Sequence, residues 1–286
     1  MTARAAVIAA AFTAACRAEL EAPKPGNVHV FADGHRMSAD DFLRSADAAA
    51  GPLSRPGARV GRRILGAVEA TRAAVGTNTN LGIILLCAPL AAAADGGPAD
   101  LRGVLTNVLG GLDIEDADLA FRAITLAAPG GLGHAEHDDV RDPARVTLAT
   151  AMAQAAARDR VAHQFSTNFA DIFDRGLARH DAAARRWADP RWATLAVYLG
   201  FLADFPDSHI ARKYGAAVAD EVRQTAFGFA RRLQCEGPDN LVADLLGWDA
   251  SLKQRSLNPG TSADLTVATL FARSLTSILP SAPNNG

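Results

Sequence analysis

Apolar residues recur along the chain at the three- and four-residue spacing of an α-helix, and this pattern continues almost from end to end. Alternation of apolar and polar residues between hairpin turns, the sign of a strand, does not appear. We therefore predict an all-α fold. The expected helices cover about residues 3–20, 38–50, 58–75, 83–94, 99–109, 114–127, 143–160, 168–179, 182–187, 190–203, 209–234, 239–255 and 262–279.

The segment 83–94 is apolar on every face. A helix without a polar stripe lies in a core or in a membrane. With about a dozen residues and Pro89 inside it, this helix is too short for a bilayer, which needs ~20. We predict a single-domain multi-helix bundle, residues 1–286, around this buried central helix. Residues 1–18 form its N-terminal helix and residues 280–286 a frayed tail.

A polar turn, residues 76–82, precedes the central helix. Its four short polar side chains are Thr77, Asn78, Thr79 and Asn80. They lie beside the unpaired N–H groups of a helix N-terminus, which favour anions. Simple N-capping is the structural alternative, and it accounts for one or two of the four.

Composition and charge exclude some classes of protein. The net charge of the 286 residues is −2 and no long basic run appears, which argues against general nucleic-acid binding. The widely spaced Cys16, Cys87 and Cys235 indicate free thiols in a reducing cytosol. Residues 1–16 are apolar enough for a signal peptide, but their alanines continue into one helix. We expect a retained helix and a cytoplasmic protein without a membrane segment.

Long polar loops rich in glycine and proline precede most of the other helices. If they converge, they surround one cavity suited to a polyphosphate, because helix N-termini and cationic side chains bind phosphates and carboxylates hold Mg²⁺. The candidate residues in or just after these loops are Lys24, Gly26, Glu136, Asp207, His209, Arg212, Lys213, Gly260, Thr261, Ser262 and Asp264.

Each of these residues also has a structural explanation. Asp207 has the position of an N-cap, and Asp264 has the spacing of a capping box with Thr261. Arg212 and Lys213 fit solvated helix charges. The histidines and acids of residues 134–139 lack the spacing of a zinc site, so they favour a hard cation, a substrate or plain loop polarity.

Five motifs occur in one order: Pro23-Lys-Pro-Gly26, the turn 76–82, and residues 131–136, 207–215 and 258–265. From about residue 19 to 271 the chain thereby resembles the triphosphoribosyl-dephospho-CoA synthase family. The resemblance implies an all-helical transferase. Such enzymes join the 5-triphosphoribosyl part of ATP to the 2′-hydroxyl of dephospho-CoA and release adenine, which gives the precursor of an acyl carrier protein's prosthetic group.

The resemblance also implies roles for the candidate residues. Lys24 and Arg212 would bind phosphates, Asn78 would orient the ribose or triphosphate, and Asp207 and Asp264 would bind Mg²⁺ or act as the base. Glu69 and Glu136 are second choices for the catalytic carboxylates, of which glycoside chemistry uses two. The substrates would be ATP or another phosphoribosyl donor and dephospho-CoA or a related hydroxyl acceptor. A homodimer is possible, but no heptad seam supports one.

The turn departs from the family pattern. Family members read Asn-Thr-His-Lys-Gly where this chain has Asn78-Thr-Asn80-Leu81-Gly82. His29 replaces a usual Asp, and Thr261 a usual Gly. The lost Lys removes a contact worth roughly 1.5–3 kcal/mol. Either Lys213 supplies this charge, or the donor or acceptor differs, as in an archaeal or methylotroph branch.

Other functions therefore stay open at this point. One is phosphoribosyl transfer to another acceptor in the synthesis of a one-carbon carrier of the tetrahydromethanopterin type. A second is an N-glycoside hydrolase that uses water in the same pocket. A third is a non-catalytic helical interaction protein.

Overall fold

The computed structural model describes residues 2–34, 37–97, 100–129 and 139–278. These residues form α-helices and one π-helix and no strand beyond two isolated bridges, so the all-α prediction is confirmed. The elements are α1 (Ala3–Glu21), α2 (Ala39–Leu53), α3 (Val60–Val75), α4 (Leu81–Asp95), α5 (Leu101–Gly110), α6 (Ile114–Ala127), α7 (Leu148–Ala155), α8 (Arg160–Ser166), the π-helix η1 (Asp171–Gly176), α9 (Leu177–Arg186), α10 (Pro190–Asp204), α11 (Ser208–Tyr214), α12 (Ala216–Glu236), α13 (Val242–Gln254) and α14 (Gly260–Ile278).

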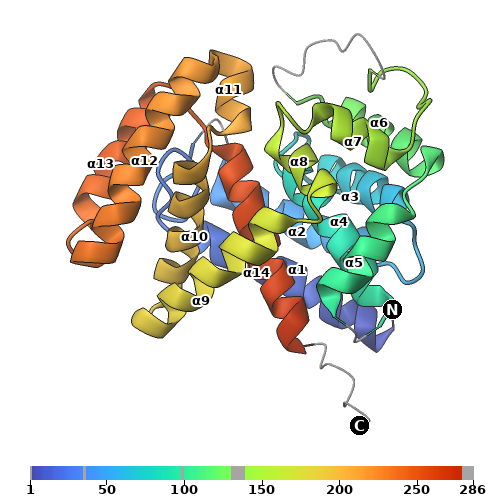
Figure 1. Cartoon of the computed structure of the whole chain (residues 1–286), viewed down its shortest axis with the longest axis horizontal. Coiled ribbons are helices and arrows are strands. Elements are labelled where there is room, and N and C mark those ends of the chain that lie inside the picture. Colours follow the sequence, from blue (N-terminus) through green and yellow to red (C-terminus); the bar gives the residue numbers. More distant parts are fainter. Residues whose placement is uncertain (1, 35–36, 98–99, 130–138, 279–286) are drawn as a thin grey trace.

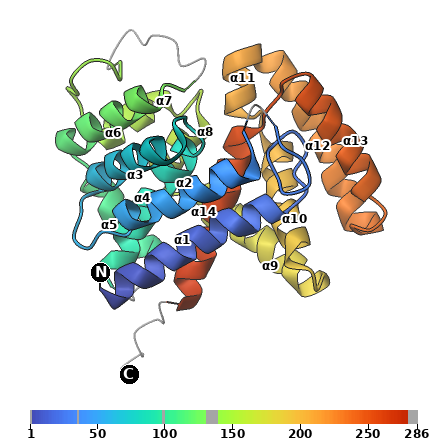
Figure 2. The ribbon, with the colours of Figure 1, turned by 180° about the vertical axis from the view of Figure 1, so that it is seen from behind.

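Two buried helices organise the fold. In α4 the residues from Ile83 to Ala91 are all buried, which confirms the predicted central helix. The last helix, α14, is also largely buried and packs against α1, α4, α10 and η1. Figure 1 shows α14 running through the middle of the molecule, with α3 to α8 on one side and α11 to α13 on the other. The view from behind shows α1 crossing the same middle region (Figure 2).

The core consists of two hydrophobic clusters, one on each side of α14. The first is built from α1 to α8, η1, most of α14 and part of α10, and it includes an edge-to-face contact between Phe12 and Phe271. The second is built from α9 to α13 with Ala263 of α14. Buried Tyr198 of α10 ties this second cluster to the N-terminal loop, because its hydroxyl donates to the carbonyl oxygen of Pro25 at 2.6 Å.

Several predicted helix starts are confirmed by their caps. Ser38 and Asp41 form the expected capping box of α2, and Asp189 caps α10. Asp207 caps α11, so its structural explanation holds. The capping box proposed for Thr261 is not formed, because α14 already begins at Gly260.

Two of the long predicted helices are wrong because polar or glycine residues interrupt them. Residues 143–160 form no single helix: Thr147 caps α7, and the Asp159 carboxylate then caps a separate α8. A side chain that accepts backbone N–H groups competes with continuation of the helix. Residues 209–234 divide at Gly215, whose φ of 90° and ψ of 160° leave the helical region.

The middle of the chain differs from prediction as well. Within residues 168–187 the π-helix η1 runs directly into α9, instead of two separate α-helices. The second helix also continues through Pro52 to Leu53 rather than ending at residue 50. The tail 280–286 lies outside the described residues.

The structure also bears on the predicted free thiols and on the expected lack of a membrane segment. Cys16 and Cys87 are buried and Cys235 is exposed, and all three are free, as expected. Burial raises the pKa of both buried thiols. Across the described ranges, each helix is too short or too polar to cross a bilayer.

Candidate active site

A cavity of about 1200 Å³ lies between the two halves of the molecule. It is lined by the N-terminal ends of α4 and α14, by α6 to α8 on one side and by α11 on the other. In Figure 1 this is the region where α11 faces α7 and α8. Pockets for one small ligand usually measure roughly 300–1,000 Å³. This cavity is therefore larger than the usual site for one small ligand.

The cavity brings together most of the turns that the sequence singled out. Loops from four separate parts of the chain reach it, as expected. The predicted site residues that line it are Thr77, Asn78, Thr79, His209, Arg212, Lys213, Gly260, Thr261 and Asp264.

Other predicted residues do not line the cavity. Those that lie behind its wall are Lys24, Gly26, Asn80, Asp207 and Ser262. Glu69 is exposed on α3 and is not among the lining residues. Glu136 lies outside the described residues. A direct role in substrate binding stays a prediction for all of them.

Four carboxylates of described residues line the cavity, and Asp264 differs from the others. Glu19, Asp139 and Asp159 each form an ion pair, with Lys24, Arg141 and Arg212. Asp264 projects from the first turns of α14 and makes no hydrogen bond with any residue of the described ranges. Burial raises the pKa of Asp264 well above its usual range, and the negative charges of Asp207, Glu19 and Asp159 raise it further. Arg212 acts in the opposite direction. An unpaired carboxyl with a raised pKa is suited to accept or donate a proton near neutral pH.

The position of Asp264 depends on a glycine in the first turn of α4. A Cβ atom at Gly82 would lie 2.0 Å from Oδ2 and 2.6 Å from Cγ of Asp264. Such distances are far inside van der Waals contact, so only glycine leaves space for the carboxyl group here. The polar turn thus ends in Gly82, which leaves the space that the Asp264 carboxyl group occupies.

Replacing Gly82 with Ala is therefore expected to displace the Asp264 carboxylate and lower kcat about 10²-fold, since a shift of an ångström can have that effect. The measurement is the steady-state turnover rate of the purified variant. Gly228→Ala is the matched control, because a Cβ atom there meets nothing within 4 Å. Full activity of Gly82→Ala would show that activity does not depend on the position of the Asp264 carboxylate beside Gly82.

Asp207 has a different environment from Asp264. It is fully buried, and its Oδ1 accepts the N–H groups of His209 (2.9 Å) and Ile210 (3.3 Å). Its Oδ2 accepts the N–H and the hydroxyl of Ser262, both at 2.8 Å. Burial raises the pKa of Asp207, and these hydrogen bonds lower it. The side chain joins α11 to α14, and its filled acceptor positions do not favour the predicted metal role.

Lys24 is also a structural residue in this geometry. Its ammonium is fully buried and donates to Asn27 Oδ1 (3.1 Å) and the Val28 carbonyl (2.6 Å), and it pairs with Glu19 at 2.7 Å. Burial lowers the pKa of Lys24 and raises that of Glu19. Glu19 and Asn27 line the cavity in front of it. Lys24 therefore fixes two cavity residues from behind.

Gly26 anchors the same loop to the second cluster. Its φ is +80°, and its N–H donates to Asp249 Oδ1 at 2.8 Å. An added Cβ atom would lie 2.9 Å from both Leu252 and Pro259. The close packing explains why glycine follows Pro25 here.

The polar turn divides its side chains between capping and the cavity. Asn78 Oδ1 accepts the N–H of Leu81 at 3.1 Å, and Thr79 donates to Ser45 Oγ at 2.6 Å. Thr77 is exposed, and Asn80 occupies the N-cap position without a side-chain cap bond. Capping thus accounts for one of the four residues, within the range of the structural alternative.

The positive charge of the cavity comes from two sides. Arg212 and Lys213 extend from α11, and Arg212 pairs with Asp159 across the cavity at 3.5 Å. Partial burial and the charge of Arg212 lower the pKa of Lys213. Arg158, in the turn before α8, and Arg160, the first residue of α8, line the same cavity. Sequence reasoning missed these two arginines because it placed them at the end of one long helix.

Glu19 and Asn258 were missed as well. Glu19 lies in a predicted helix just before the first motif, and Asn258 begins the last motif but was not selected. Their proximity to the motifs was the available signal. No cluster of three or more His, Cys, Asp or Glu side chains suited to a metal ion occurs among the residues described.

The fold and the cavity define an all-helical protein with a large cavity lined by charged side chains. A family model described as ATP:dephospho-CoA triphosphoribosyl transferase, CitG, matches residues 5–282. The chain belongs to this family, as its motifs predicted.

A solved structure is similar in fold. It is a protein from Archaeoglobus fulgidus described as a triphosphoribosyl-dephospho-CoA synthase, with 21% sequence identity and a TM-score of 0.63. The match covers 82% of this chain and 99% of that chain. At this identity the likeness supports the fold alone. No curated protein sequence matches the chain.

Proposed function

We propose that this chain transfers the 5-triphosphoribosyl group of ATP to the 2′-hydroxyl of dephospho-CoA and releases adenine. The family defines this reaction. The observation that carries it here is the Asp264 carboxylate, which lies unpaired among described residues in a cavity larger than the usual site for one small ligand.

In this reaction the bond between C1′ of the ribose and the adenine nitrogen breaks, and a bond forms between C1′ and the acceptor oxygen. Asp264 accepts the proton of the attacking hydroxyl, and because its pKa is raised its carboxylate is a stronger base than an ordinary aspartate. Its negative charge also stabilises the positive charge that develops at the sugar ring. Adenine leaves with the bonding electron pair and takes up a proton.

Arg212 and Lys213 bind the phosphates of the donor, and Asn78 orients the ribose from the opposite wall. Cationic donors form short, strong hydrogen bonds with phosphate oxygens. The Lys213 ammonium makes no hydrogen bond to a described residue, so it is available for this contact. This supports the idea that Lys213 supplies the charge absent from the turn.

Magnesium enters with the substrate as MgATP. Mg²⁺ in such sites keeps several waters and uses one or two carboxylates together with substrate phosphates. Asp264 is a carboxylate that is open to the cavity, whereas the Asp207 oxygens already accept four hydrogen bonds. The residues described therefore fit a metal carried by the triphosphate better than a resident metal site. A homodimer and a cytoplasmic location stay predictions.

Incubation of the purified protein with ATP, Mg²⁺ and dephospho-CoA tests the proposal. We expect free adenine, together with dephospho-CoA whose mass has increased by one triphosphoribosyl unit. The control omits the acceptor, and adenine formed without it would instead indicate a hydrolase. Turnover only with a pterin-linked ribitol would assign a different acceptor, and no adenine under any condition would remove the transferase proposal.

A further inference from the structure

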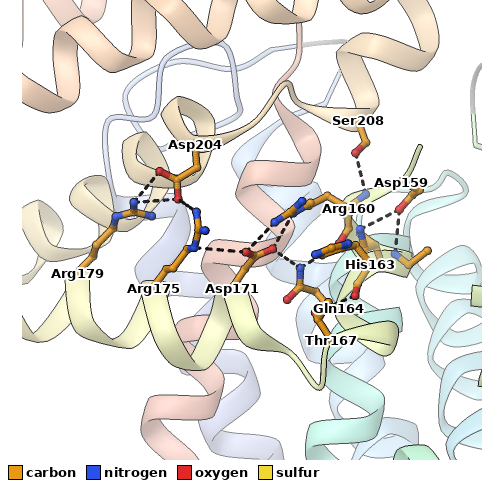
Figure 3. Close-up of polar contacts among 12 residues, drawn as sticks. Asp159, Arg160, His163, Gln164, Thr167, Asp171, Arg175, Arg179, Asp204 and Ser208 are labelled. Carbon is orange, nitrogen blue, oxygen red and sulfur yellow. Dashed lines mark hydrogen bonds and ion pairs between the residues drawn. The ribbon is translucent and has the colours of Figure 1, made fainter. Parts of the chain in front are cut away.

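Arg160 is held in one orientation at the edge of the cavity. Its Nε donates to Asp171 Oδ2 at 2.7 Å and its Nη2 donates to Oδ1 at 2.8 Å. The ring of Phe205 lies against the guanidinium, 4.3 Å from its central carbon to the ring centroid. Figure 3 shows the Arg160 side chain reaching Asp171. Arg160 and Phe205 both line the cavity, whereas Asp171 does not.

Asp171 is itself fixed in the protein interior. It is 3% exposed, and Gln164 donates to its Oδ2 at 2.6 Å. Gln164 is fully buried. The far end of the same π-helix is packed onto α14, since a Cβ atom at Gly176 would lie 2.4 Å from Thr269 Oγ1. The carboxylate that holds Arg160 is therefore anchored to α14.

The backbone between α8 and η1 is strained to bring Asp171 back onto Arg160. Asn168 and Phe169 have φ angles of 51° and 56°, in the left-handed region. Two successive non-glycine residues there are unfavourable, and such strain gathers at functional sites. Phe169 is fully buried and packs on Phe165, with ring centroids 5.7 Å apart. The π-helix that follows is likewise a rare element that is frequent at functional sites.

Part of the Arg160 guanidinium remains available to a ligand. Its Nη1 makes no hydrogen bond with the described part of the chain, and the side chain is 24% exposed. The ion pair with Asp171 does not cancel the local charge. Asp171 and Asp204 together contact three guanidinium groups, those of Arg160, Arg175 and Arg179. This group of three guanidinium groups and two carboxylates carries one excess positive charge, and its Arg160 lines the same cavity as Arg212 and Lys213.

We propose that Arg160 binds a polyphosphate chain of one of the two nucleotide substrates and that Asp171 is its positioning residue. The proposal rests on the proposed function, because it assigns a further residue to the same cavity. A guanidinium whose orientation is fixed before binding presents planar donors to phosphate oxygens with little loss of freedom. ATP supplies a triphosphate and dephospho-CoA a diphosphate, and the two are distinguished by experiment.

A second ion pair in this protein is a matched control. Arg102 pairs with both carboxylate oxygens of Asp174, on the same π-helix, and its guanidinium lies 5.4 Å from the Phe173 ring. This pair has the same chemistry, but it is on the surface and outside the cavity lining. Arg102→Gln and Asp174→Asn therefore report what loss of such a pair does to the fold alone.

The test measures kcat and KM for each substrate in Arg160→Gln, Asp171→Asn and the double variant, with affinity for inorganic tripolyphosphate by calorimetry. We expect KM for one substrate to rise 10–100-fold with kcat within threefold, and tripolyphosphate affinity to fall at least tenfold. A rise in KM for ATP assigns the triphosphate, and a rise for dephospho-CoA assigns the diphosphate. Asp171→Asn should have no added effect once Arg160 is replaced, because it acts through Arg160. The two control variants should match the wild type.

The proposal is overturned if folded Arg160→Gln keeps both KM values and the tripolyphosphate affinity, or if the two substitutions add independently. Should Arg160→Gln fail to fold, Arg160→Lys keeps the charge without the planar donors and should raise KM at least fivefold; an unchanged KM again rejects the proposal. These outcomes differ from failure of the proposed function, in which the wild-type protein itself releases no adenine.

Discussion

Replacing Asp264 with Asn is expected to lower kcat for adenine release about 10²–10⁴-fold, the usual contribution of a general base. The KM for ATP should stay within a few fold, because the amide has the same shape and the phosphates bind to other residues. Steady-state kinetics with both nucleotides measures this effect. Asp239→Asn, at an exposed position outside the cavity, is the control and should leave kcat unchanged.

The pH dependence of kcat/KM is an independent test of Asp264 as the general base. Asp264 must be ionised to accept a proton, so kcat/KM of the wild type should rise with pH through its pKa. Because burial and nearby acids raise that pKa, the increase in kcat/KM should occur at a pH above the ordinary aspartate pKa of about 3.9. The residual activity of Asp264→Asn should lack this rise. An identical profile in the variant would assign the base to another group.

Stability should change in the opposite direction from activity. The folded-state pKa of Asp264 is raised, so the unfolded chain ionises more readily and stability is lost as pH increases above the unfolded value. Asn removes this penalty, and Tm of the variant at pH 8 should rise by about 2–4 °C, with a smaller gain at pH 5. A lower Tm at pH 8 would mean that the carboxylate has stabilising partners in solution.

Replacing Asp207 with Ala is expected to destabilise the fold by at least about 3 kcal/mol, because several buried donors lose their acceptor and each costs about 1–3 kcal/mol. The donors are the N–H groups of His209 and Ile210 and both polar groups of Ser262. In a chain of this size the loss corresponds to a fall in Tm of roughly 6–12 °C. Thermal unfolding followed by circular dichroism measures it.

Asp189→Ala provides the comparison for Asp207→Ala. Asp189 also caps a helix, but it is partly exposed and accepts one backbone N–H, that of Arg191. Its loss should destabilise the protein by about 1 kcal/mol, as for an ordinary cap. If Asp207→Ala instead keeps the wild-type Tm and loses only activity, Asp207 belongs to the chemistry and not to the framework.

How far the sequence predicts this protein depends on how local the signal is. The helix α4 and the capping box of Ser38 and Asp41 follow from residues a few positions apart, and both are confirmed. Asp207 and Asp264 could not be told apart in this way. Their difference arises because Ser262 lies 55 residues from Asp207 and because Gly82 of α4 packs on Asp264 of α14.

The arginines at the start of α8 show the same limit. Arg160 is within a run of helix-forming residues, and the local sign that α8 begins there is the preceding Asp159, a residue type that also occurs inside helices. Its orientation comes from Asp171, which reaches it through left-handed angles at Asn168 and Phe169. Phe169 is a residue type that rarely takes such angles, so the local sequence does not indicate this turn. The order of five motifs identified the family, while the packing assigns the side chains.

The burial of two of the three thiols has a practical consequence. Thiolate is the reactive form, and Cys16 and Cys87 are enclosed with raised pKa values, so alkylating reagents should reach Cys235 alone in the native enzyme. Cys235 lies at the end of α12 and outside the cavity lining. A single fluorescent dye can thus be attached to the natural chain without an engineered cysteine. The rate at which Cys16 and Cys87 are labelled would then measure the rate at which the protein unfolds.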